Sequence, residues 1–137
     1  MKNHLETPCR FSFVYLDDEI AIIEKPAGLL AVRGRGTANQ TNLASNVRAI
    51  YPDALVVHRL DRDTSGLMVM ARGVEAQRQL ARQFEERRVT KRYIAIVYGS
   101  LAPDRGLIEL PMRKDLEHPP RRASILLTAV QRLRSGA

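Results

Sequence analysis

The order of apolar patterns along the chain is the feature that most restricts its fold. Residues 11–24 alternate apolar and polar side chains around Asp17 and Asp18, which predicts a β-hairpin. Helical patterns follow at residues 41–50 and 74–88, with short apolar runs before and after each. Strands therefore do not alternate one by one with helices, as a doubly wound sheet requires. We expect an α/β (α+β) fold with a mixed, mainly antiparallel sheet and helices packed on it.

Four further segments are short, apolar and bounded by Gly, Pro or charged loops, so we predict strands there. They are residues 55–57, 67–71, 92–98 and 107–110. Thr41 or Asn42 is placed to cap the first helix, because a side-chain oxygen there can accept from a free backbone N–H group. Residues 125–133 have no clear strand pattern, and we interpret them as a helix.

Composition narrows the class of protein and of partner. The net charge of +7 favours a polyanion such as RNA, and only four of the 22 basic residues are lysines. Arginine suits phosphate recognition through its planar fork, although a GC-rich genome would also raise its use. The single cysteine, Cys9, excludes an internal disulfide and a Cys-rich zinc site. No apolar run approaches the ~20 residues of a membrane span, and no signal peptide is evident. We expect a cytoplasmic protein without membrane association.

A charged loop between two of the predicted strands is the strongest candidate for chemistry. A carboxylate held half-buried there can serve as a nucleophile, provided that a nearby cation such as Arg59 or Arg62 keeps it ionised. Thr64 adds a hydroxyl group. The alternative is a capped turn, in which Asp61 or Asp63 accepts hydrogen bonds from backbone amides.

The loop also resembles a known family. It reads His58-Arg59-Leu60-Asp61-Arg62-Asp63-Thr64-Ser65-Gly66, similar to the signature loop of the RluA family of pseudouridine synthases. Residues 25–29 (Lys-Pro-Ala-Gly-Leu) and 91–95 (Lys-Arg-Tyr-Ile-Ala) resemble two further family segments, in the family's order and spacing. The resemblance covers about residues 11–119. Because no S4 RNA-binding domain precedes these motifs, the S4-less branch of the family is the best match.

The resemblance implies an enzyme that converts uridine to pseudouridine in structured ribosomal or transfer RNA, without a metal or cofactor. Asp61 matches the catalytic aspartate, and whether it adds to C1′ or removes a 2′ proton stays open. Arg59 matches the arginine that holds the flipped-out nucleotide, since the target must leave the base stack. Tyr93 matches the tyrosine that stacks on the uracil and serves proton transfer. For His58 we expect a structural role.

Five side chains are expected to hold the RNA, mostly through phosphates, which give affinity without sequence information. They are Arg33, Arg35, Arg62, Thr64 and Lys91. We expect a monomer. Two other functions stay open: a non-catalytic RNA-binding remnant, and a hydrolase with a metal at His58, Asp61 and Asp63. The latter would need further ligands, which the sequence does not offer at suitable spacing.

The end of the chain departs from the family pattern. We divide the sequence into an N-terminal extension (1–10), the N-terminal part of the catalytic domain (11–120) and a divergent basic tail (121–137). Residues 121–137 lack the family's later Gly-Arg-(Ser/Thr)-His-Gln-(Leu/Ile)-Arg motif, whose arginine pairs with the catalytic aspartate. Our hypothesis is a truncated or frame-shifted product with a sheet that is incomplete at the C-terminus, which predicts low stability and weak activity.

Overall fold

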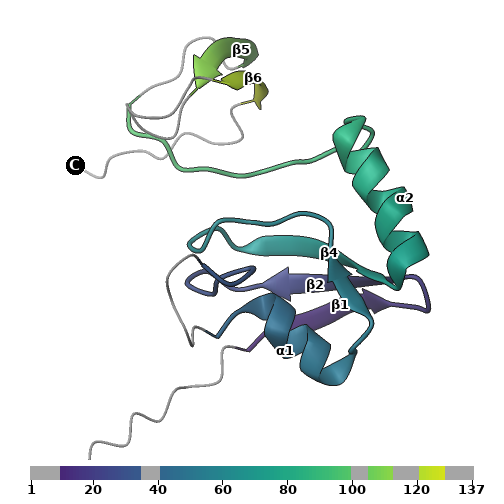
Figure 1. Ribbon diagram of the computed structural model, residues 1–137. Coiled ribbons are helices and arrows are strands. Elements are labelled where there is room, and N and C mark those ends of the chain that lie inside the picture. The colour runs from purple at the N-terminus through teal and green to yellow at the C-terminus, as the bar shows by residue number, and fades with distance from the viewer. Residues whose placement is uncertain (1–9, 35–40, 100–104, 113–120, 129–137) are drawn as a thin grey trace, which may run out of the picture. The chain divides into compact units, whose positions relative to one another are not determined.

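The computed structural model describes residues 10–34, 41–99, 105–112 and 121–128 (Figure 1). The chain forms two compact units, residues 1–91 and 92–137, and each is described here by itself. Arg35 and Cys9, singled out above, lie outside the described residues.

The first unit is built on a four-stranded antiparallel sheet with the order β1-β2-β4-β3. Its strands are β1 (Ser12–Leu16), β2 (Ile20–Lys25), β3 (Ala54–Val56) and β4 (Gly66–Arg72). The predicted hairpin is confirmed as β1 and β2. Asp17 closes its turn, since carboxylate Oδ1 accepts from the backbone N–H groups of Glu19 at 2.8 Å and Ile20 at 2.7 Å. The antiparallel sheet confirms the expected fold class.

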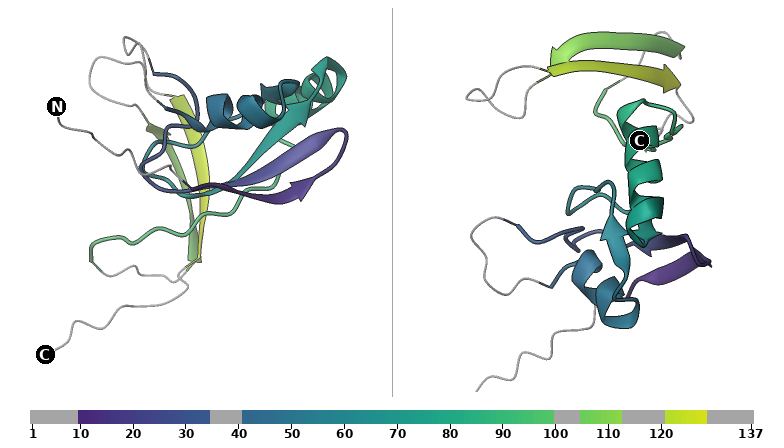
Figure 2. Two further views of the ribbon diagram at one scale, coloured as in Figure 1. Left: turned by 90° about the horizontal axis from the view of Figure 1, so that it is seen from below. Right: turned by 45° about the vertical axis from the view of Figure 1, so that its right-hand side comes forward.

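The core of this unit lies between the sheet and helix α1 (Leu43–Ile50), as two further views show (Figure 2). Alternate residues of the central strands point to one face, as the period of two in a strand requires. The buried side chains include Ala21, Ile23, Ala54, Met68 and Met70 from the sheet, and Leu43, Ala44 and Val47 from α1. Asn42 is the predicted cap, because its Oδ1 accepts from the backbone N–H of Ser45 at 3.0 Å.

Helix α2 (Val74–Glu85) follows β4 and is shorter than the predicted 74–88. The backbone N–H groups of Arg87 and Arg88 donate to the carbonyls of Phe84 at 3.2 Å and Gln83 at 2.9 Å. This arrangement is a Schellman motif, in which a residue with positive φ reverses the chain. Arg87 takes that place with φ 56°, where glycine is the usual residue. Neither described helix has the length or apolar character that a membrane-spanning helix needs.

The second unit contains one antiparallel strand pair, β5 (Arg105–Met112) and β6 (Arg121–Thr128). Two predictions were wrong here. Residues 92–98 are irregular and exposed, because strand composition needs a hydrogen-bonded neighbour and no described strand pairs with them. Residues 121–128 form a strand, whereas we expected a helix from residue 125 on. A short apolar run does not by itself distinguish helix from strand, and the partner β5 decides.

Candidate active site

The signature loop joins β3 to β4, as predicted. Its one buried side chain is Leu60, which is 8% exposed and packs into the core. Arg59 and Asp61, on either side of Leu60, are both exposed. Asp61 also begins a turn, since its carbonyl accepts from the backbone N–H of Thr64 at 3.2 Å. The loop is therefore anchored through Leu60 and presents the expected catalytic side chains to solvent.

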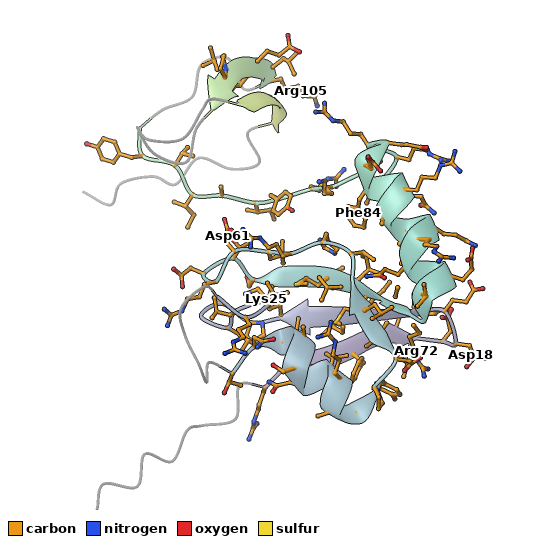
Figure 3. The ribbon with its side chains drawn as sticks, viewed as in Figure 1. Asp18, Lys25, Asp61, Arg72, Phe84 and Arg105 are labelled. Atoms are coloured by element: carbon orange, nitrogen blue, oxygen red, sulfur yellow. The ribbon has the colours of Figure 1, made fainter. Side chains whose placement is uncertain are left out.

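A buried lysine ties the loop to the end of β2. Lys25 is fully buried, and its Nζ donates to the carbonyls of Pro26 (2.9 Å), Leu29 (2.7 Å) and Arg62 (2.9 Å). An ammonium group has three protons, so each of them has a partner. Figure 3 shows Lys25 at the end of β2 and Asp61 on the loop. The Lys-Pro-Ala-Gly segment and the signature loop, 37 residues apart at this contact, thus share one charged hydrogen-bonding group.

A second connection joins the same two segments. The backbone N–H of Gly28 donates to the carbonyl of Arg62 at 2.9 Å, and Nε of Arg62 donates to the carbonyl of Gly28 at 3.2 Å. Gly28 has φ 85°, a conformation that glycine adopts without steric cost. Arg62, expected to contact RNA, therefore uses its Nε to join the segments while its side chain stays exposed.

The loop differs from the prediction in the exposure of Asp61, and it has a further charge beside it in Lys25. Burial lowers the pKa of Lys25, while the carboxylates of Asp63 and Asp61 act in the opposite direction and favour its charged form. We expected Arg59 and Arg62 to supply the cation, and a half-buried carboxylate. Asp61 is instead exposed, and its carboxylate, together with that of Asp63, interacts with the charge of Lys25. The available signal for Lys25 was its place between a strand and Pro-Ala-Gly, in a chain with few lysines.

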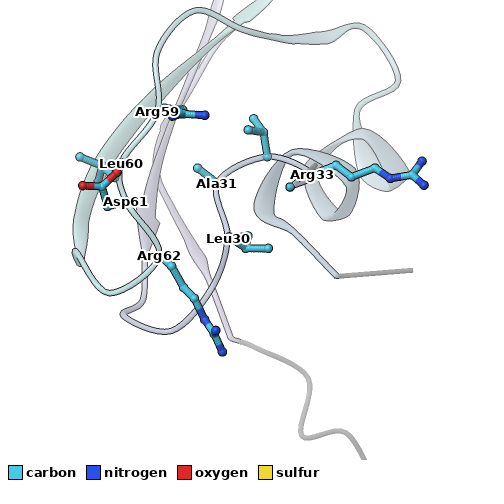
Figure 4. Close-up of a pocket in the computed structure, with 9 residues that line it drawn as sticks. Leu30, Ala31, Arg33, Arg59, Leu60, Asp61 and Arg62 are labelled. Carbon is cyan, nitrogen blue, oxygen red and sulfur yellow. The ribbon is translucent and has the colours of Figure 1, made fainter. Parts of the chain in front are cut away.

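A pocket of about 160 Å³ lies between the loop and residues 30–34 (Figure 4). This volume holds more than one water molecule, since one needs about 10–15 Å³ of such space, and the pocket is partly open to solvent. The carbonyls of Leu30 and Ala31 accept from the first backbone N–H groups of α1, at 2.8 and 3.0 Å, which fixes this wall. Arg59 reaches toward the wall, whereas Arg33 and Arg62 extend away from the pocket.

His58 occupies the start of the loop and contacts two other elements. Its Nε2 accepts from the backbone N–H of Val69 at 3.0 Å, and its ring stacks on Phe84 with centroids 4.5 Å apart and planes at 19°. Burial lowers the pKa of His58, and the charge of Lys91 lowers it further. Lys91 Nζ also lies 5.9 Å from the centre of the Phe84 ring. These contacts support the structural role that we expected for His58.

The first unit brings together only part of the predicted site. Four of its residues line the pocket: Arg33, Arg59, Asp61 and Arg62. Thr64 is half-buried in the turn, and Lys91 lies beside Phe84. Tyr93 belongs to the second unit, and its side chain is 62% exposed. Over the described ranges, no group of three or more His, Cys, Asp or Glu residues is arranged to hold a metal ion.

Comparison with known proteins identifies the family. The family described as RNA pseudouridylate synthase matches residues 19–133. The chain belongs to this family. The Dual-specificity RNA pseudouridine synthase RluA of Yersinia pestis is 45% identical over 108 residues, which cover 79% of this chain and 52% of the relative. The protein of the same name in Escherichia coli strain K12 is 42% identical over 108 residues, which cover 79% of this chain and 49% of that relative. The chain spans about half the length of these curated relatives.

A solved structure has the same fold. The Human RNA Pseudouridylate Synthase Domain Containing 4 aligns with a TM-score of 0.61 at 23% identity, over 84% of this chain and 50% of that chain. The expected membership of the RluA family is therefore confirmed, and so is the pseudouridine synthase fold. One expectation is corrected: the family match does not stop near residue 120 but continues to residue 133. The three segment boundaries remain a prediction.

Proposed function

We propose that this chain carries the catalytic loop of an RNA pseudouridine synthase, with Asp61 as the catalytic carboxylate. The observation that carries the proposal is the placement of Asp61. The family's signature aspartate lies exposed beside a pocket, on a loop that Lys25 and Leu60 anchor to the core. Curated relatives named Dual-specificity RNA pseudouridine synthase RluA share 42–45% of aligned residues and support the same activity.

The reaction is an isomerisation with a closed balance of atoms. The N1–C1′ bond of uridine breaks, the uracil turns, and C5 bonds to C1′. The proton on C5 is lost and N1 gains one, so no redox partner or co-substrate is consumed. Asp61 acts on the ribose, either by adding to C1′ or by removing the 2′ proton. The family resemblance, and not a contact within the described residues, assigns Tyr93 to stacking on the uracil and to the proton transfer.

The target nucleotide has to leave its base stack before its sugar can reach Asp61, and this costs a few kcal/mol. Arg59 is placed to offset that cost, because it lies two residues from Asp61 and reaches toward the pocket. Lys25 binds the backbone of the loop at Arg62, and the carboxylates of Asp63 and Asp61 favour its charged form. The pocket wall is tied to α1 through the carbonyls of Leu30 and Ala31.

The substrate is a structured ribosomal or transfer RNA, held mostly through its phosphates. The net charge of +7 supports this. Arg33, Arg62 and Lys91 are exposed for such contacts, Thr64 can donate a hydroxyl, and Arg35 would add a further charge. We propose that the protein works as a monomer in the cytoplasm, without a metal or cofactor.

The experiment is a substitution of Asp61 with a control in the same loop. Asp61→Asn removes the negative charge and keeps the size of the side chain. We expect loss of pseudouridine formation in ribosomal and transfer RNA, measured by mass mapping, with RNA affinity nearly unchanged. Asp63→Asn is the matched control, because Asp63 is also exposed two residues away. Equal activity in wild-type protein and Asp61→Asn contradicts the proposal. RNA binding without any product from wild-type protein would indicate the non-catalytic remnant.

A further inference from the structure

The imidazole of His58 takes the place of a strand at the edge of the sheet. The ladder between β3 and β4 ends at the pair Val56 and Met70. Beyond this pair the backbone of β3 leaves the sheet, and the next N–H group on that edge of β4 belongs to Val69. This N–H donates to Nε2 of His58 at 3.0 Å. A side chain thus continues the ladder that the backbone discontinues.

This contact fixes the protonation state of the ring. Because the Val69 N–H donates, Nε2 must carry a lone pair, so the imidazole is neutral with its proton on Nδ1. Phe84 holds the ring from α2 by stacking. The two groups that contact the ring from β4 and α2 are uncharged. The charged group acting on it is Lys91, and burial and Lys91 both favour the neutral form.

The backbone of the signature loop then has three fixed points. His58 is bound to β4, Leu60 is buried in the core, and the carbonyl of Arg62 binds Lys25 and the Gly28 amide. These anchors alternate with the exposed residues Arg59 and Asp61. Removing the first anchor frees the backbone of Arg59 on one side, and releases Leu60 and Asp61 to a smaller extent.

We propose that His58, as the neutral Nδ1-protonated imidazole, is a positioning residue. It fixes the loop backbone beside β4 and so determines where Arg59 and Asp61 lie. What those two residues do rests on the proposed function, whereas their placement can be measured without it. His58 acts through its acceptor atom, so an acceptor at the same place should substitute for it and a ring without an acceptor should not.

Two variants separate the acceptor from the ring. His58→Phe keeps a ring that can stack on Phe84 but removes the acceptor. His58→Gln removes the ring, while its side-chain carbonyl can accept near the place of Nε2. In His58→Phe we expect amide hydrogen exchange at Val69 to rise about 5- to 10-fold, as for one lost hydrogen bond. The amide resonances of Arg59, Leu60 and Asp61 should shift, and His58→Gln should resemble the wild type in both respects.

Turnover gives a second measurement. A misplaced Arg59 and Asp61 should lower kcat by about 100-fold in His58→Phe, with a smaller change in KM. Amide exchange at Val69 and the loop resonances are also recorded with the His58 variants in an Asp61→Asn background, because these measurements of position do not require an active protein. If wild-type protein makes no pseudouridine, the proposed function fails, but the spectra still decide the positioning role.

The wild-type protein provides the test if a variant does not fold. Acidification protonates Nε2, which then faces the Val69 N–H as a second donor, so the loop resonances should move with the titration of His58. His58→Gln should not show this movement. Three results would overturn the proposal: an Nε2-protonated imidazole in wild-type protein near neutral pH, unchanged loop resonances in His58→Phe, or equal losses in His58→Phe and His58→Gln. Unchanged resonances in His58→Phe would mean that only ring packing matters, and equal losses in the two variants would mean that an acceptor alone does not substitute for His58.

Discussion

Replacing Lys25 should destabilise the first unit more than any other single charge removal at the loop. The change is Lys25→Met, which keeps most of the length of the side chain but removes Nζ and its three hydrogen bonds. The carbonyl of Arg62 keeps a partner in the Gly28 amide, whereas within the described residues Nζ is the hydrogen-bond donor to the carbonyls of Pro26 and Leu29.

The magnitude follows from those two carbonyls. A buried polar group that loses its partner costs about 1–3 kcal/mol, and because the bond to Leu29 is buried and the bond to Pro26 half-buried, the two together cost about 2–4 kcal/mol. Removing a buried charge returns part of its desolvation penalty, as the lowered pKa of Lys25 indicates. We therefore expect a loss of about 3 kcal/mol in the free energy of unfolding, within the range of severe single substitutions.

The assay is urea unfolding followed by circular dichroism, together with amide hydrogen exchange over residues 60–66. Exchange there should increase more than in α1, because the substitution releases the loop in particular. Glu24→Gln is the control, since Glu24 is an exposed neighbour on the same strand with one long hydrogen bond of 3.4 Å from Ser12. A loss below about 0.5 kcal/mol, the size of an ordinary surface substitution, would refute the role of Lys25 as the anchor of the loop.

Three further outcomes are expected. Arg87→Gly should raise the free energy of unfolding by about 1 kcal/mol in chemical denaturation, because Arg87 has φ 56°, while Arg78→Gly in the helix interior should lower it by about as much. Asn42→Ala should cost about 1 kcal/mol by loss of the α1 cap, whereas Asn46→Ala should cost little. The pKa of His58 is lowered on folding, so the unfolded chain binds its proton first, and stability should fall as pH drops below about 6.5. Unfolding curves at several pH values should lose this slope in His58→Phe, and an unchanged slope would contradict the assignment.

Local patterns in the sequence correctly predict the parts of the fold that are stabilised by local interactions. The hairpin turn at Asp17, the cap at Asn42 and the polar loop after β3 each depend on contacts within a few residues. Residues 92–98 and 121–128 were assigned wrongly because a strand depends on a neighbour that is distant in the sequence. Composition alone does not show whether that neighbour is present.

Part of the site could also be predicted from the sequence, and part of it depends on contacts that the sequence does not show. The motif identified the loop and pointed to Arg59 and Asp61, and the structure places both at one pocket. It did not reveal the role of Lys25, because the partners of Lys25 are backbone carbonyls and carry no side-chain signature. Nor could it show that Asp61 is exposed, since exposure depends on how Leu60 packs into the core.

The anchoring of the loop by Lys25 has a consequence for how such a loop can change. Nζ binds main-chain oxygens only, and every residue type offers the same oxygen. The hydrogen bond from Nζ to the carbonyl at position 62 therefore does not depend on the side chain there, although a change of Arg62 removes its Nε contact to the carbonyl of Gly28. Selection for a different RNA can act on position 62 while the Lys25 anchor still holds the backbone beside the carboxylate at position 61. The same separation makes the loop a practical place to engineer RNA preference.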